Sequence, residues 1–310
     1  MGVMSIQDAH THFFSRPFFR ALAGMSALQE DKQALVARVA AQAKLQLPDE
    51  STAAHRDRWL SEMDRHGVAR MVSFASVPAE AEVVAEAARG SGGRLVPYAL
   101  VNPRDEQAPA FTQKALGSLG IRGLLTFPAM HHFKAGDPCL TPILELARAH
   151  KAPVIVHCGL LRVKLRDLLG VPRPYDLSYA NPLEIVPAAN RFRDVTFVVP
   201  HFGAGFLRET LMLGMQCENV CVDTSSSNDW LMTQSSTAGD DGRLALATVF
   251  RRALDVFGAE RILFGTDSST FPRGWRADIK DAQLAALETA GCKGAELEAI
   301  MGGNLARLLP

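Results

Sequence analysis

Short apolar runs rich in β-branched residues alternate along this chain with longer amphipathic stretches, and the alternation occurs eight times. This pattern is typical of βα units around a parallel sheet. Eight such units predict a closed (β/α)8 TIM barrel, with an open doubly wound sheet as the competing architecture. The expected strands are Val3–Asp8, Ala69–Ala75, Arg94–Val101, Gly123–Phe127, Pro153–Val156, Val195–Val199, Val220–Asp223 and Arg261–Gly265.

One segment does not fit the repeat. Residues 13–55 separate the first expected strand from its helix and are rich in Ala and Gln, so we expect a helical cap inserted there. The rest of the 310-residue chain is close to the length of one barrel, which predicts a single, distorted barrel domain over residues 1–310. The expected helices include Glu80–Arg89, Pro142–His150, Leu183–Phe192, Phe206–Gln216, Leu244–Phe257 and Ile279–Ala290.

Composition argues against several classes of protein. The chain has 33 Lys and Arg against 33 Asp and Glu, so its net charge is zero and gives no field to attract nucleic acid. No apolar run approaches the roughly 18 residues of a membrane span, and the first residues lack the order of a secretory signal. We therefore expect a cytoplasmic protein with a small-molecule substrate and five reduced cysteines, and we leave a homodimer open.

The most informative residues are in the segment Asp8-Ala9-His10-Thr11-His12, at the carboxyl end of the first expected strand. Side chains at positions i and i+2 of a strand share a face, so His10 and His12 project together and can reach one cation. The simpler alternative is a pair of polar residues on a loop. Asp8 shares their face, and we expect it either to orient one of the histidines or to cap a turn.

Three other strand ends carry residues of the same kind. His157 follows the fifth expected strand, His201 the sixth and Asp267 the eighth. In a barrel these strand ends meet at the face where active sites lie. Three imidazoles and a carboxylate match the ligand chemistry of a catalytic zinc site. The residues therefore predict a metal site at this face.

In this arrangement the sequence resembles the amidohydrolase superfamily, and within it the branch of aminocarboxymuconate-semialdehyde decarboxylase. The resemblance rests on the HxH motif, the single histidines after strands five and six, Phe264-Gly265-Thr266-Asp267, and the terminal segment 302–309. It covers nearly the whole chain, with residues 13–55 as the weakly matching part.

The resemblance implies roles for the strand-end residues. It implies that His10, His12, His157 and Asp267 bind one divalent metal, and that Asp267 and His201 are catalytic. Zn²⁺ is expected before Mn²⁺ because nitrogen ligands dominate. The fourth strand carries no lysine of the kind that bridges two metals in other branches, so we expect a mononuclear site.

The expected activity is metal-dependent hydrolysis through a metal-activated water. We expect a small, carboxylated, cyclic or unsaturated lactone or amide as the substrate. The alternative is a carboxy-lyase of the aminocarboxymuconate-semialdehyde decarboxylase type. The expected mouth of the barrel combines charge with an apolar wall, and its candidate substrate-binding residues are Phe127, Arg162, Lys164, Arg273 and Trp275.

Two further interpretations compete with this one. Gly203-Ala204-Gly205 after the sixth strand, with Asp223 at the end of the seventh, outlines a dinucleotide fingerprint and hence an NAD-binding oxidoreductase. Arg208 stands where the third glycine should be, which argues against it. The other alternative is a metal-free lactonase or a non-catalytic barrel that binds ligands in the same pocket.

The remaining histidines are expected away from the site. His131 and His132 follow the fourth strand, and we interpret them as an exposed loop pair because adjacent side chains point apart. His55, His66 and His150 lie on or after helices and are expected to be solvated.

Overall fold

The computed structural model describes residues 5–234 and 244–309, and its eight parallel strands follow one another around a barrel in sequence order. Backbone hydrogen bonds join the segment just after the last strand to the first strand, from Asp267 N to His10 O (2.9 Å) and from His12 N to Ser268 O (2.8 Å). The barrel is confirmed and the open sheet is excluded. The strands are β1 (Ile6–His12), β2 (Val68–Ala75), β3 (Leu95–Leu100), β4 (Gly123–Thr126), β5 (Val154–Val156), β6 (Phe197–Val199), β7 (Val220–Asp223) and β8 (Ile262–Leu263).

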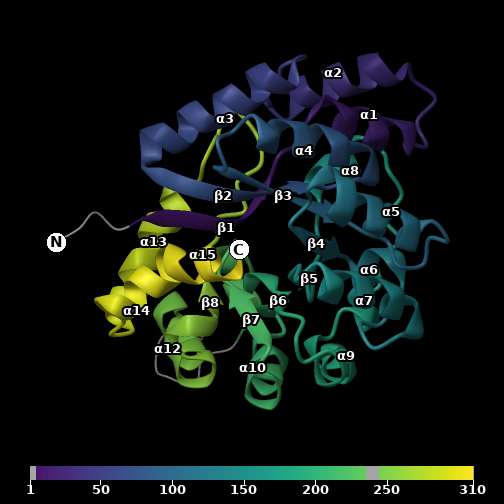
Figure 1. The fold of residues 1–310 in the computed structure, drawn as a ribbon. Helices are drawn as coiled ribbons and strands as arrows, with labels where there is room; N and C mark the ends of the chain where they lie inside the picture. Colours follow the sequence, from purple (N-terminus) through teal and green to yellow (C-terminus); the bar gives the residue numbers. More distant parts are fainter. Residues whose placement is uncertain (1–4, 235–243, 310) are drawn as a thin grey trace.

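Helices surround the strands on the outside of the barrel (Figure 1). Those predicted from the sequence are present, with ends that differ by a few residues. The helices are α1 (Arg16–Gly24), α2 (Lys32–Gln42), α3 (Thr52–His66), α4 (Ala81–Arg89), α5 (Ala108–Lys114), α6 (Pro128–His131), α7 (Thr141–Ala149), α8 (Lys164–Leu168), α9 (Val186–Arg191), α10 (Leu207–Gln216), α11 (Ser227–Trp230), α12 (Leu246–Phe257), α13 (Ala277–Thr289), α14 (Ala295–Glu298) and α15 (Asn304–Leu308).

The first strand differs most from its prediction, because it continues through both histidines of the HxH motif. Thr11 pairs with Ser73 and His12 with Phe74 on β2, while the segment just after β8 is bonded to the other edge of β1. The sequence argument ended the strand at Asp8, where the apolar run stops. Pairing on both edges satisfies the backbone polar groups of this polar segment and keeps it extended.

Apolar side chains fill the inside of the barrel below the histidines. One buried cluster contains inward-facing residues of all eight strands, together with Leu305 on α15 and Leu309 just beyond it. A larger cluster packs the outer faces of the strands against the surrounding helices. Burial of both strand faces explains why the strands are continuous apolar runs rather than alternating ones.

Residues 13–55 contain α1, α2 and the first turn of α3. Phe18, Leu22 and Leu35 from this segment pack in a buried cluster with Val77, which follows β2, and Leu169, which follows α8. The ring of Phe14 stacks on Phe18, with centroids 4.0 Å apart. Figure 1 shows α1 and α2 beside α4 and α8, so the insertion spans loops that follow several different strands.

A buried carboxylate ties this insertion to the barrel. Glu80 is fully buried, and its Oε1 accepts hydrogen bonds from Ser15 N (2.5 Å) and Ser15 Oγ (2.8 Å), at the start of α1. Its Oε2 accepts from Ser76 N (2.8 Å), just after β2. Burial raises the pKa of Glu80 to about 7, against the lowering effect of these hydrogen bonds.

Two sequence expectations about individual residues have different outcomes. His55 is not solvated: it is 3% exposed, and its Nε2 lies 2.9 Å from Phe13 O, so that prediction is wrong. Its position on the inner side of α3, under the insertion, could not be inferred from the helix alone.

The five cysteines are free thiols, as expected.

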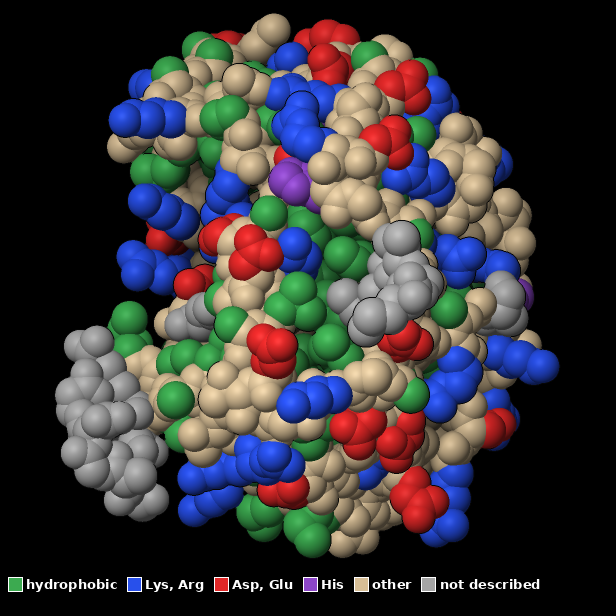
Figure 2. Space-filling model, turned by 90° about the vertical axis from the view of Figure 1, so that its left-hand side faces the viewer, with side chains coloured by type: hydrophobic (Ala, Val, Ile, Leu, Met, Phe, Trp, Pro, Cys, Tyr) green, Lys and Arg blue, Asp and Glu red, His purple; other side chains and the backbone are tan. Residues whose placement is uncertain are grey.

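The distribution of charged side chains on the surface agrees with the equal numbers of positive and negative residues in the sequence. Positive and negative side chains are interspersed over the face that Figure 2 shows, rather than separated by sign. Within the residues that the structure describes, no helix combines the length and the apolar character that a membrane span requires.

The burial of Glu80 predicts a pH dependence of stability. The folded protein keeps the Glu80 proton up to about pH 7, whereas an unfolded chain releases it near 4.5. Between these values the folded state binds more protons, so stability falls as the pH rises. In Glu80→Gln, the decline in the free energy of unfolding from about pH 5 to about pH 8 should be smaller by about 1–3 kcal/mol.

Urea unfolding at a series of pH values measures this difference. The exposed Glu82→Gln, two residues further on, is the control and should keep the decline of the unchanged protein. Parallel pH profiles for Glu80→Gln and the unchanged protein would contradict the prediction.

Candidate metal centre

Three side chains from the first and last strands converge at the carboxyl end of the barrel. His10 and His12 lie on one face of β1, and Asp267 lies four residues beyond β8. The Oδ1 atom of Asp267 is 3.8 Å from His10 Nε2 and 3.2 Å from His12 Nε2. The HxH motif therefore brings two imidazole nitrogens to the same carboxylate oxygen.

The other nitrogen of each imidazole is held by the neighbouring strands. His10 Nδ1 is 2.8 Å from Asp223 Oδ2 at the end of β7, and His12 Nδ1 is 2.7 Å from Ser76 Oγ after β2. These contacts fix both rings with Nε2 toward Asp267. Partners of this kind orient metal-binding histidines and increase their basicity.

Asp223 is the functional residue that the sequence analysis missed. It was considered only as the acid of a dinucleotide fingerprint, whereas in the structure its Oδ2 contacts His10 and its Oδ1 accepts from His201 N (3.1 Å). A carboxylate at the end of a buried strand, in the same position as the strand-end histidines, was the available signal. The dinucleotide interpretation does not fit this arrangement.

Two more histidines complete the ring of side chains. His157 and His201 are both buried, and their rings lie 5.2 Å apart. His201 is also 4.7 Å from the His10 ring, and its Nδ1 is 2.8 Å from the backbone oxygen of Ser225. His157 Nδ1 has no hydrogen-bond partner among the described residues. All the strand-end residues predicted from the sequence thus gather in one place.

Charge in this cluster is unevenly distributed. Burial raises the pKa of Asp267, but a hydrogen bond to His12 and the charges of His12 and His10 outweigh it and hold the pKa well below its usual range. The charge and hydrogen bond of His10 likewise overcome burial and lower the pKa of Asp223 to about 2. Burial, with the neighbouring His201, holds the pKa of His157 well below its usual range, so its ring is neutral near pH 7.

The backbone is strained where it presents the two residues expected to be catalytic. His201 has φ = 57° and Asp267 has φ = 60°, in the left-handed region that L-residues seldom adopt. The Asp267 carboxylate is held from the other side by Ser226 Oγ, 2.7 Å from its Oδ2. Such strain persists only where the surroundings enforce it, and it is concentrated at functional sites.

The donor set fits one divalent cation. Ligand atoms of His10, His12 and Asp267 all lie within 4.8 Å of one another. His157 is not part of this group, but its ring lies 5.2 Å from that of His201, and its buried Nδ1 has no partner among the described residues. The ligand atoms of a second group, His10, His201 and Asp223, also lie within 4.8 Å of one another. In that group, however, His10 Nδ1 and Asp223 Oδ2 are already hydrogen-bonded to each other.

The predicted substrate-binding residues are spread more widely. The Phe127 ring lies 4.9 Å from His157, beside the metal residues. Arg162 and Lys164 are exposed on the segment after β5. Arg273 is also exposed, with Nη2 3.3 Å from Ser269 Oγ, and Asp267 contributes to its electrostatic surroundings.

Trp275 and Asp8 have a structural contact instead. Trp275 is 2% exposed, and its Nε1 donates to Asp8 Oδ2 at 2.8 Å. Asp8 also accepts from His10 N (2.9 Å) and Thr266 N (3.1 Å), so it joins β1 to the segment after β8. Asp8 therefore positions backbone rather than a histidine ring. The Trp275 side chain packs in the apolar cluster between the strands and the surrounding helices, not in the mouth of the barrel.

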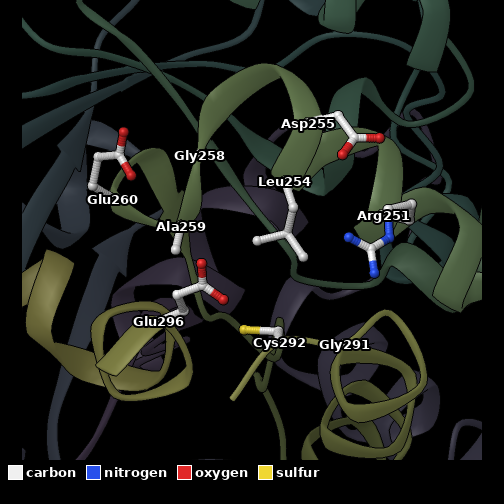
Figure 3. A pocket seen from close by; sticks show the side chains of 9 residues that line it. All are labelled: Arg251, Leu254, Asp255, Gly258, Ala259, Glu260, Gly291, Cys292 and Glu296. Carbon is white, nitrogen blue, oxygen red and sulfur yellow. The ribbon is translucent and has the colours of Figure 1, made fainter. Parts of the chain in front are cut away.

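A separate pocket lies on the outside of the barrel, between α12 and the turn before α14 (Figure 3). Its volume is about 330 Å³, and its charged side chains have both signs: Arg251, Asp255, Glu260 and Glu296. None of the strand-end residues lines it. The candidate metal centre is thus distinct from this pocket.

Comparisons with known proteins bear on the family and the fold of this chain. A family model described as amidohydrolase matches residues 7–310. The chain has no significant match among curated proteins. Among solved structures, 5-carboxyvanillate decarboxylase from Sphingomonas paucimobilis shares 15% identity, with 99% of each chain covered and a TM-score of 0.66.

Two other solved structures are similar over the same length. An amidohydrolase from Burkholderia multivorans with bound zinc shares 15% identity over 99% of this chain and 100% of its own, with a TM-score of 0.63. A probable 2-pyrone-4,6-dicarboxylic acid hydrolase from Acinetobacter baumannii, with citric acid bound, shares 15% identity over 98% and 99%, with a TM-score of 0.59. At these identities the likeness shows a common fold.

Asp223→Asn tests the contact that orients His10. The substitution keeps the shape of the side chain but removes the charge beside Nδ1, so zinc affinity should fall about 10- to 100-fold. Competition with a chromophoric chelator measures the dissociation constant. Asp229→Asn, an exposed acid on α11, is the matched control. Equal affinities for Asp223→Asn and the unchanged protein would show that Asp223 does not support the metal residues.

Proposed function

This chain belongs to the amidohydrolase family, and from that premise we propose that it is a metal-dependent hydrolase of a small, carboxylated, cyclic or unsaturated lactone or amide. The observation that carries the proposal is the convergence of Asp267 with His10 and His12 at the carboxyl end of the barrel. Active sites of this fold lie at that end. The substrate class follows from the combination of an apolar ring, Phe127, with cationic side chains in the surrounding loops.

His10, His12, His157 and Asp267 are the residues that would hold one divalent metal ion, with Zn²⁺ ahead of Mn²⁺ because of the nitrogen donors. When bound, such an ion acts as a Lewis acid that polarises a carbonyl oxygen and makes a water molecule more acidic. Zinc in the similar Burkholderia multivorans structure supports this choice.

The protein's own groups then move the protons. Asp267, ionised because of its histidine neighbours, accepts a proton from the attacking water and returns it to the leaving group. Ser226 holds the second carboxylate oxygen and so fixes the direction in which Asp267 faces. His201, with Nδ1 directed at the Ser225 oxygen, keeps Nε2 for a hydrogen bond to the reacting group.

The second candidate is decarboxylation of a carboxylated ring. It is favoured by the similarity to 5-carboxyvanillate decarboxylase. In that reaction the substrate loses carbon dioxide, and a proton replaces the carboxylate on the ring carbon. Asp267, which is ionised, would first take a proton from water and then give it to the ring carbon, so in both reactions it accepts a proton before it delivers one.

Substitution of the two catalytic candidates should separate chemistry from metal binding. Loss of the proposed hydrogen bond to the reacting group in His201→Ala should lower turnover about 10²- to 10⁴-fold. About one equivalent of zinc should remain bound, because His201 is not one of the four proposed ligands. Asp267→Asn should lower turnover by at least as much. Elemental analysis alongside steady-state kinetics checks both, and His150→Ala, an exposed histidine, is the control. Loss of the metal in His201→Ala would refute its assignment as an unliganded residue.

The reaction class is tested by the products formed. Lactones, amides and carboxylated aromatic acids should be assayed for acid release and for carbon dioxide together. We expect acid release from a carboxylated lactone or amide, which is lost when zinc is removed with a chelator and restored when zinc is added. Carbon dioxide without a hydrolysis product would move the protein to the carboxy-lyases, and activity that survives metal removal would contradict both candidates.

A further inference from the structure

Three side chains after β4 and β5 carry buried polar atoms that have no hydrogen-bond partner among the described residues. They are His131 Nδ1, Arg166 Nε and the Tyr175 hydroxyl, which we call the Arg166 cluster. Buried polar groups are nearly always paired, because leaving one unpaired costs about 1–3 kcal/mol. Arg166 and Tyr175 do affect each other, because the guanidinium counteracts the rise that burial gives to the pKa of the Tyr175 hydroxyl. None of the three atoms has a hydrogen bond of ordinary geometry, so together they point to a missing partner.

The three side chains lie close together around one positive charge. The Arg166 guanidinium carbon is 6.0 Å from the centre of the Tyr175 ring. Burial and then the charge of Arg166 lower the pKa of His131 to about 4. The adjacent acid, Asp167, is paired with Arg173 at 2.9 Å, and no described carboxylate forms an ion pair with Arg166. Among the described residues the Arg166 guanidinium therefore has no ion-pair partner, although the Asp167 carboxylate also acts on the Tyr175 hydroxyl.

The cluster lies in the loops that follow β4 and β5, and His157 of the candidate metal centre also follows β5. His131 is the last residue of α6, one helical turn after Phe127, whose ring lies 4.9 Å from that of His157. Arg166 is on α8, in the loop that follows β5 and His157. Met130 and Leu161, from the same two loops, pack on the cluster of side chains inside the barrel. The Arg166 cluster therefore follows the same two strand ends as Phe127 and His157.

We propose that the Arg166 cluster is an anion subsite, which binds a carboxylate of the substrate that does not itself react. A guanidinium, a phenol and an imidazole together donate several hydrogen bonds, which suits the two oxygens of a carboxylate. The ring of the substrate would lie against Phe127, with its reacting group toward Asp267. This inference rests on the proposed function and narrows the substrate to a compound with two acidic groups, or one acidic group and a lactone or amide.

The structure favours Arg166 over the cations chosen from sequence for this role. Arg162 and Lys164 are exposed, whereas Arg166 is partly buried with an unpartnered Nε. A partly dehydrated guanidinium interacts more strongly with an anion than one surrounded by water does. The structure also corrects the expectation for the histidine pair after strand four. His131 lies half-buried on a short helix, not on an exposed loop.

Two simple acids serve as probes of the zinc-loaded, full-length protein. Benzoate has one carboxylate, whereas isophthalate has a second one at the meta position of the same ring. Titration calorimetry should show that isophthalate binds about tenfold more tightly than benzoate. Arg166→Met, which keeps the length of the side chain, should remove this preference by weakening isophthalate about tenfold while benzoate changes less than about twofold. Arg193→Met, at an exposed position just after α9, is the matched control and should keep the preference.

Tyr175→Phe gives a second test that removes only one oxygen atom, and it should weaken isophthalate by a smaller factor than Arg166→Met does. Absence of an isophthalate preference in the unchanged protein would overturn the subsite, and so would an intact preference in Arg166→Met. Failure of the proposed function has a different signature. In that case zinc does not change the affinity of either acid. Isophthalate still binds more tightly than benzoate, and Arg166→Met still weakens isophthalate.

Discussion

The hydrogen bonds that close the barrel, between the first strand and the segment just after the last one, also build the candidate metal centre. Asp267 N donates to His10 O, and His12 N donates to Ser268 O. These bonds place the Asp267 carboxylate beside the HxH motif, although more than 250 residues separate them in the chain. The rest of the centre is arranged around this pairing, because the other strands contribute side chains that surround Asp267 and the HxH motif.

The sequence predicted the barrel and the group of strand-end residues for a physical reason. Buried parallel strands are continuous apolar runs, so the first polar residue after each run marks a strand end. His157 and His201 were found in this way. The same reasoning placed the end of β1 too early, because pairing on both edges keeps a polar segment extended, and that pairing is a long-range property.

Contacts between distant loops could not be predicted from one sequence. Asp223 supports His10, and Glu80 joins Ser15 to Ser76, across separations that no local pattern records. Arg166 is another example. Its exposed neighbours Arg162 and Lys164 look equivalent in the sequence, and only the fold shows which of the three is partly buried and lacks a partner.

The stacking of Phe14 on Phe18 in the insertion has a consequence for how this protein can diversify. Phe14 also stacks on the ring of His12, with centroids 4.9 Å apart, and Ser76, which Glu80 holds, contacts the other side of His12. The insertion is thus anchored to a residue of the reaction centre itself. A graft of a foreign insertion onto this barrel would have to include the end of β1 and the start of the segment after β2. The insertion, the end of β1 and the start of the segment after β2 would therefore have to be exchanged together, because the insertion alone lacks its contacts with His12 and Ser76.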